Sequence, residues 1–208
     1  MKKFLLFGLI FLITGATSAQ IYSANNAAGF APWTTTDLDS DGFNWQAADI
    51  SAVTSPMAVF GECIASFSYD FAASSPLTPD NLLASPAINC SAFSNINLSW
   101  AVGSNADTGT GWHQEHYAVY VVTDLTAVQS GTFPTPVFET TLTAGWTVIN
   151  ESINIDAQAA AQPNVYVVMR HFNCTDEYYL LLDDILITGS SKLTNMIVYQ
   201  FEYNSPSH

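Results

Sequence analysis

Apolar residues along this chain recur in short runs, and clusters of Asn, Ser, Thr, Gly and Pro separate the runs. Some runs alternate apolar and polar residues, and none holds the 3.6-residue spacing of an amphipathic helix. This rhythm is typical of an all-β protein built from two packed sheets. It predicts nine strands, at residues 29–33, 58–69, 82–88, 96–102, 116–123, 137–142, 147–155, 164–170 and 178–188.

Between the predicted strands, the segment 156–162 reads DAQAAAQ and favours one or two helical turns, since Ala and Gln are good helix formers. Long polar connections fall at residues 105–113 and 131–136. Loops at the ends of a rigid sandwich are where binding sites concentrate.

The first residues have the order of a secretory signal peptide. Lys2 and Lys3 precede an apolar run at residues 4–13, and small residues then lead to Ala19. The run is too short to span a bilayer. We therefore expect a cleaved signal peptide at residues 1–19, a single secreted or surface-exposed domain at 20–190 and a C-terminal tail at 191–208.

Without residues 1–19, the chain keeps two basic side chains, Arg170 and Lys192, against eighteen acidic ones, a net charge of −16. It lacks the cluster of basic side chains that binding to nucleic acid or to an anionic membrane surface requires. We therefore expect no nucleic-acid partner and no membrane insertion. So much negative charge repels itself in a compact fold. Outside the cell, Ca²⁺ is the abundant ion that neutralises it.

Cys63, Cys90 and Cys174 are too few for a disulfide scaffold. One pair can form, and Cys63 with Cys90 is the candidate, which leaves Cys174 free.

The stretch TTTDLDSDGFNW places Asp37, Asp39 and Asp41 two residues apart, followed by Gly42. It matches the start of a calcium-binding EF-hand loop, but that loop needs an acid at its twelfth position, where this chain has Ala48. Three carboxylates in five residues still suit a hard cation. A plain solvated turn explains them equally well.

A second acidic element interrupts the apolar run YYLLLDDILITG. Adjacent strand residues point to opposite faces, so one of Asp183 and Asp184 is expected to face the core. A buried carboxylate needs a proton, hydrogen bonds or a cation. A metal ion is the simpler partner in a chain with one arginine, unless the strand is exposed there and both acids are solvated.

Little else in the sequence indicates chemistry. His113, Glu115 and His116 lack the order of a zinc-protease helix, so Glu115 is expected to be an oxygen ligand and His116 to be packed or hydrogen-bonded. No nucleophile elbow, catalytic cysteine signature or distinctive carboxylate pair is present. Four tryptophans belong either to the core or to a sugar-stacking surface, at Trp33, Trp45, Trp112 and Trp146.

Four motifs occur in order over residues 28–188: TTTDLDSDGFNW, SPLTPDNLLASPAI, EHYAVYVV and VMRHFNCTDEYYLLLDDILI. Together they resemble the cleaved-adhesin or choice-of-anchor J family, secreted bacterial jelly rolls also found in gingipain haemagglutinin regions and distantly similar to MAM domains. The resemblance implies a calcium-stabilised jelly-roll β-sandwich that binds ligands and has no catalytic centre. The calcium ligands that it implies are Asp37, Asp39, Asp41, Glu115, Asp183 and Asp184.

The chain departs from the family pattern at two positions. Ser40 replaces a glycine of the acidic turn, and Leu82 replaces an aromatic residue of the second motif. The tail YQFEYNSPSH resembles the start of a sorting domain of the kind read by the type IX secretion system.

The leading hypothesis is an adhesin-like binding module in which calcium ties the acidic turn to the last strand. Its ligand would be a glycan or an extracellular protein. One alternative is a carbohydrate-active hydrolase, or an ancillary carbohydrate-binding domain, on the same fold. Another is a structural domain of the cell envelope without a specific ligand.

Overall fold

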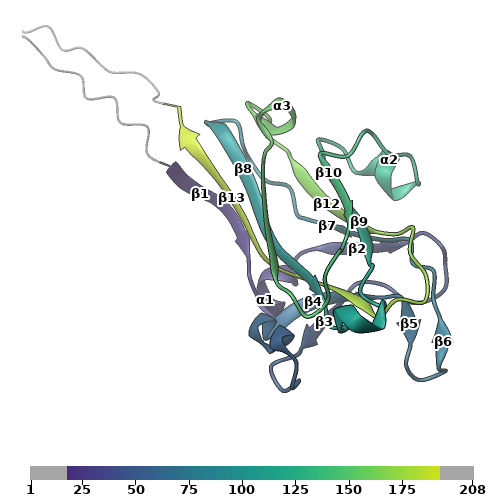
Figure 1. The fold of residues 1–208 in the computed structure, drawn as a ribbon. Coiled ribbons are helices and arrows are strands. Elements are labelled where there is room, and N and C mark those ends of the chain that lie inside the picture. Colours follow the sequence, from purple (N-terminus) through teal and green to yellow (C-terminus); the bar gives the residue numbers. More distant parts are fainter. Residues whose placement is uncertain (1–17, 193–208) are drawn as a thin grey trace, which may run out of the picture.

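The computed structural model describes residues 18–192, which form two main sheets packed face to face and a small hairpin (Figure 1). Residues 1–17 of the predicted signal peptide and 193–208 of the predicted tail lie outside the described residues. The all-β, two-sheet prediction is confirmed. Among the described residues, no helix combines the length and apolar character needed to cross a membrane.

Each sheet is antiparallel and joins strands that are distant in the sequence. The six-stranded sheet runs β11 (Ile149–Asn154), β8 (Phe93–Ser104), β13 (Tyr179–Ser191), β4 (Glu62–Phe67) and β3 (Gln46–Asp49), and β1 (Ser18–Ala24) also pairs with β13. The five-stranded sheet runs β10 (Phe138–Thr141), β9 (His116–Val122), β12 (Tyr166–His171), β7 (Asn81–Ala84) and β2 (Thr34–Asp37). The hairpin pairs β5 (Tyr69–Asp70) with β6 (Ser75–Pro76).

Within residues 18–192, five short helices connect the strands. They are α1 (Ala27–Phe30), η1 (Pro56–Phe60), η2 (Thr108–Thr110), α2 (Thr126–Gln129) and α3 (Asp156–Ala159). The helix α3 confirms the helical turn predicted for residues 156–162.

The main core lies between the two sheets, and loops cover part of each outer face. Trp100, Leu98 and Leu182 of one sheet meet Val119 and Met169 of the other in a single cluster. A second cluster packs the η1 segment against the outer face of the six-stranded sheet. A third packs Val128 of α2 against the outer face of the five-stranded sheet. Strands buried on both faces explain why several apolar runs in the sequence hardly alternate.

One predicted strand is wrong. Residues 29–33 contain the end of α1, whose start is capped by Asn26 through a 2.9 Å hydrogen bond from the Gly29 amide. Gly29 also lies close to the chain before it, since a Cβ there would be 2.9 Å from Ala24 Cα. The local cap and this close approach override the apolar character of the segment.

The predicted Cys63–Cys90 disulfide is also wrong, because all three cysteines are free. Cys63 faces the second cluster on the outer side of the six-stranded sheet, whereas Cys90 belongs to the main core. Burial, together with the charges of Asp183 and Asp49, raises the pKa of Cys63 to about 12. The two thiols are separated by a sheet that neither side chain can cross.

The acidic pair of the last strand lies where β13 exchanges one partner for another. β13 pairs with β4 as far as Leu182 and with β1 from Ile185. Its pairing with β8 continues on both sides, but a bulge shifts the register between Asp183 and Leu186. Asp184 takes a positive φ of 50° in the bulge and is exposed, whereas Asp183 is only 6% exposed. One acid is therefore buried, but not in the main core. Asp183 pairs with Ala101 of the second cluster, so it lies on the outer face of the six-stranded sheet beneath the η1 segment.

Candidate functional site

The structure divides the six predicted calcium ligands among three places. Carboxylate oxygens of Asp37, Asp39 and Asp41 lie within 4.8 Å of one another. Glu115 instead groups with His171 and Cys174. Asp183 and Asp184 join neither group and belong to the other sheet from Asp37. One ion held by all six acids, tying the acidic turn to the last strand, is therefore excluded.

The acidic turn follows β2 and leads to β3, so it carries the chain from one sheet to the other. Asp37 organises it by accepting hydrogen bonds from the backbone amides of Ser40 at 2.7 Å and Gly42 at 3.0 Å. Asp41 accepts from the Phe43 amide at 2.7 Å. These bonds fix the carboxylates of Asp37 and Asp41, and oxygens of all three acids lie within 4.8 Å of one another.

Ser40 stands where the family pattern has glycine, and it adopts the conformation that glycine would prefer. Its φ is 59°, and that of Gly42 is 88°. A serine in the left-handed region costs about 1–2 kcal/mol. Ser40 therefore adds strain to the turn.

The electrostatics of the acidic turn indicate excess negative charge. Burial, the hydrogen bond to Asp37 and the charge of Asp41 raise the pKa of Asp39 to about 6. Burial acts in the same direction on Asp37, but hydrogen bonds from Asp39 and from backbone amides lower the pKa of that carboxyl. Three neighbouring carboxylates are a donor set of hard oxygens, which fits Ca²⁺.

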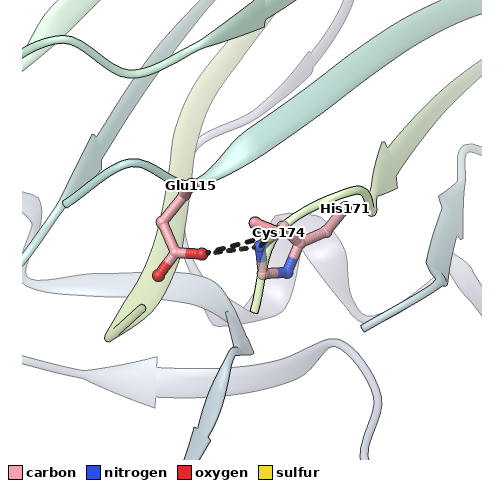
Figure 2. Close-up of side chains that lie close together, drawn as sticks. All are labelled: Glu115, His171 and Cys174. Carbon is pink, nitrogen blue, oxygen red and sulfur yellow. Dashed lines mark hydrogen bonds and ion pairs between the residues drawn. The ribbon is translucent and has the colours of Figure 1, made fainter. Parts of the chain in front are cut away.

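A buried polar cluster surrounds Glu115, whose side chain is fully buried. Figure 2 shows Glu115 with two members of this cluster, His171 and Cys174. We define this cluster by six side chains, Ser66, Ser68, Asn81, Glu115, His171 and Cys174. Glu115 precedes β9, and His171 ends β12, the neighbouring strand. Glu115 Oε2 lies 2.9 Å from His171 Nε2 and accepts a hydrogen bond from Ser68 at 2.5 Å.

The positive partner that the sequence seemed to lack is a histidine. Burial by itself lowers the pKa of His171, but the adjacent Cys174 and Glu115 outweigh it and raise this pKa to about 10. The single arginine is committed elsewhere: Arg170 makes two 2.7 Å hydrogen bonds to Asp80 and stacks on Phe133 and Phe172. His171 is thus the residue that the sequence argument missed.

The remaining histidines of this region differ in their surroundings. His116 is hydrogen-bonded, as predicted, to Thr141 at 2.8 Å and to Glu139 at 3.1 Å. His113 is 6% exposed, and its Nδ1 has no hydrogen-bond partner.

An aromatic surface lies at the end of the sandwich that carries the β5–β6 hairpin. We define it by Tyr69, Phe71, Trp112, Trp146 and Tyr178. All but Trp146 line a cavity of about 290 Å³ together with Asp176 and Glu177. Trp112 and Tyr178 also line the neighbouring hollow, which adds Trp146.

The tryptophans divide between the two roles considered for them. Trp33 and Trp45 are buried in the main core. Trp112 and Trp146 are 55% and 42% exposed, and Phe71 beside them is 47% exposed. Exposed large aromatics gathered around a hollow mark a binding surface more often than a structural one.

The chain matches the Cleaved Adhesin Domain family over residues 19–187. It belongs to this family. Its sequence is 28% identical to gingipain R1 of Porphyromonas gingivalis, over 78% of this chain and 10% of that protein. It is 31% identical to hemagglutinin A of the same species, over 76% of this chain and 8% of that protein. The family member described here therefore spans a small part of these relatives.

Solved structures agree with this assignment. The K3 cleaved adhesin domain of Lys-gingipain from P. gingivalis has a TM-score of 0.65 and 28% identity, over 83% of this chain and 99% of that one. The K1 domain of the same protein has a TM-score of 0.63 and 27% identity, over 84% of this chain and 99% of the K1 chain. A family 22 carbohydrate binding module of Clostridium thermocellum Xyn10B has a TM-score of 0.50 at 10% identity, over 85% and 96%, which shows a shared fold alone.

Proposed function

We propose that this chain is an extracellular, non-catalytic adhesin module that binds glycans through its aromatic surface and is stabilised by Ca²⁺ at its acidic turn. The observation that carries the ligand proposal is the set of exposed aromatic rings around the 290 Å³ cavity. Family membership supports the adhesin role.

The aromatic surface has the chemistry that a sugar ring requires. The apolar face of a pyranose packs on an aromatic ring, and its hydroxyl groups need hydrogen-bond acceptors at the rim. Trp112 and Tyr178 supply rings that both hollows share, and Asp176 and Glu177 supply carboxylate oxygens. Phe71 packs edge-on against Tyr178 at a centroid distance of 4.8 Å, which holds that ring in place.

The alternative of a glycoside hydrolase needs two carboxyl groups facing each other across the bound sugar. The acids of the cavity, Asp176 and Glu177, are consecutive residues of the loop between β12 and β13. The Glu177 carboxylate is also engaged, because it accepts a hydrogen bond from the Gln114 amide at 3.0 Å. This arrangement favours binding over hydrolysis.

The ligand proposal is tested on a glycan array with the wild-type chain, Trp112→Ala and Val59→Ala. Val59 is the matched control, since it is an apolar side chain 74% exposed outside the aromatic surface. We expect Trp112→Ala to weaken glycan binding about fivefold, because each ring contact contributes about 1 kcal/mol, and Val59→Ala to leave it unchanged. Glycan cleavage would support the hydrolase instead. Binding only to extracellular proteins, or to nothing, would overturn the glycan proposal.

The proposed calcium role follows from the place of the acidic turn between the sheets. An ion bound by Asp37, Asp39 and Asp41 would fasten β2 to the chain that enters β3. At a Ca²⁺ concentration a hundred times Kd, it would add about 2.7 kcal/mol to the free energy of unfolding. We expect EGTA to lower the melting temperature of the wild-type chain.

Two aspartate variants make this calcium test specific. Asp39→Asn should abolish the EGTA effect and, in EGTA, should melt at or above the wild-type temperature, because it removes a repelled charge. Asp183→Asn should keep the full EGTA effect, since Asp183 lies outside the acidic turn. Equal melting curves with and without EGTA for the wild-type chain would refute the calcium role. A loss of the EGTA effect in Asp183→Asn would assign the ion to the last strand.

A further inference from the structure

The buried polar cluster brings four different donor atoms to one point. They are Glu115 Oε2, His171 Nε2, Cys174 Sγ and Ser68 Oγ. The sulfur lies 3.2 Å from the histidine nitrogen and 3.6 Å from the glutamate oxygen, and nitrogen and oxygen are 2.9 Å apart. Ser68 Oγ is 2.5, 3.3 and 3.6 Å from oxygen, nitrogen and sulfur, respectively. Each atom thus neighbours the other three.

These separations are close to the edges of a small tetrahedral metal site. Zinc bonds of about 2.3 Å to sulfur and 2.0–2.2 Å to nitrogen and oxygen place tetrahedral ligands about 3.4–3.6 Å apart. Both edges from sulfur to oxygen already have this length. The two shortest edges are the contacts of Glu115 Oε2 with Ser68 at 2.5 Å and with His171 at 2.9 Å. The edges from His171 Nε2 to Cys174 at 3.2 Å and to Ser68 at 3.3 Å are only slightly short. Admitting an ion therefore requires mainly that the Glu115 carboxylate moves away from these two partners.

The histidine is oriented as metal-binding histidines usually are. Its Nδ1 lies 2.8 Å from Ser66 Oγ, which also accepts a hydrogen bond from the Asn81 amide. This contact fixes the ring and leaves Nε2 facing both the thiol and the carboxylate (Figure 2). In a nucleophilic triad, the thiol would contact one ring nitrogen of the histidine and the acid would contact the other. Because the Cys174 thiol and the Glu115 carboxylate both contact His171 Nε2, the arrangement favours a set of metal ligands over a catalytic cysteine.

A second observation indicates that the cluster is incomplete in the protein alone. Glu115 and His171 have fully buried side chains, and Glu115 Oε1 has no hydrogen-bond partner. A buried carboxylate with an unsatisfied oxygen is costly. A divalent ion bound by this carboxylate and a thiolate would be neutralised by two negative ligands. Cys174 is partly exposed in the loop before β13, which gives an ion a path from solvent.

We propose that Glu115, His171 and Cys174, with Ser68 as the fourth donor, form a binding site for Zn²⁺ that is separate from the acidic turn. Sulfur and imidazole ligands select zinc over calcium, which takes oxygen ligands. Ser66 is a positioning residue that orients the His171 ring. The site does not depend on the proposed glycan or calcium functions, because it shares no residue with either surface.

The test uses tag-free chain, freed of metal by a chelator and kept reduced without a thiol reagent, and titrated with Zn²⁺ and Co²⁺. We expect one tightly bound Zn²⁺ per chain. Co²⁺ should give the intense visible bands of a tetrahedral ion and a near-ultraviolet thiolate-to-cobalt band. Cys174→Ser should abolish the thiolate band and weaken Zn²⁺ binding by at least about 100-fold, and Ser66→Ala should weaken it about 10- to 100-fold.

Matched controls separate this site from others on the chain. His116→Gln alters a nearby histidine bound to Glu139, and Asp39→Asn alters the acidic turn, so both should keep the cobalt spectrum. Circular dichroism and melting curves confirm that each variant is folded. Absence of stoichiometric binding, or a thiolate band that survives Cys174→Ser, would overturn the proposal. Binding that is lost in Asp39→Asn would also overturn it, by placing the ion at the acidic turn.

Discussion

Replacing His171 with leucine should lower the free energy of unfolding by about 3–5 kcal/mol at pH 7, because it leaves a buried charge without its partner. The Glu115 and His171 side chains are both fully buried, and their charged atoms lie 2.9 Å apart. Urea denaturation of the metal-free chain, followed by tryptophan fluorescence, measures the loss.

A double-mutant cycle shows whether the loss comes from the pair. Because Glu115→Leu/His171→Leu removes both charges, it should cost clearly less than the sum of the two single changes. His116→Leu is the control, since His116 pairs with the 43% exposed side chain of Glu139 and should lose under about 1 kcal/mol. Single effects that add to the double effect within about 0.5 kcal/mol would show that the two charges do not interact.

The same pair should make stability depend on pH in a defined direction. The pKa of His171 is about 10 in the folded chain, above the value of about 6.5 expected for histidine in the unfolded chain. The folded state therefore binds the proton more tightly, and this contribution is complete below about pH 6.5 and is lost as pH rises toward 10. Wild-type stability should fall over that range, and the fall should be smaller in Glu115→Leu/His171→Leu.

The sequence predicts the centre of the sandwich better than its edges. The strands β8, β9, β12 and β13 are long, central and rich in apolar residues, so their positions follow from the pattern. The edge strands β2 and β3 read TTTD and QAAD, and little in them distinguishes a strand from a loop. They are strands because the neighbours β7 and β4 supply hydrogen bonds, which is a tertiary effect.

The candidate site was only partly predictable for a similar reason. Asp37, Asp39 and Asp41 are close in sequence, so their convergence follows from the local turn. Glu115 and His171 are 56 residues apart and meet because β9 and β12 pair in a register that the sequence does not show. The scarcity of lysine and arginine pointed to a metal as the partner of buried acids, but a histidine can also carry the charge. His171 three residues before Cys174 was the available signal.

Replacing Gly145 with alanine should destabilise the chain by about 3 kcal/mol, at the upper end of the cost of overpacking. A Cβ at this position would lie 2.0 Å from the Ala106 carbonyl oxygen and 2.8 Å from the Thr108 amide nitrogen. Both are backbone atoms, so one of the two loops must move. Gly145 also exchanges hydrogen bonds with the Thr108 side chain at 2.8 and 3.1 Å, and these would break.

The Gly145 change should reach the aromatic surface as well, because the two loops carry its tryptophans. Trp146 follows Gly145 and donates from its indole to the Asn105 carbonyl at 2.9 Å. Gly109→Ala is the control in the same loop: its Cβ would meet only one side-chain oxygen of Asp107, at 3.1 Å, and no backbone atom. If the surface binds glycans as proposed, Gly145→Ala should lose binding at temperatures where it is still folded, and Gly109→Ala should retain it. Unchanged stability in Gly145→Ala would mean that the loops separate freely, and a surface built on them could not be preorganised for a ligand.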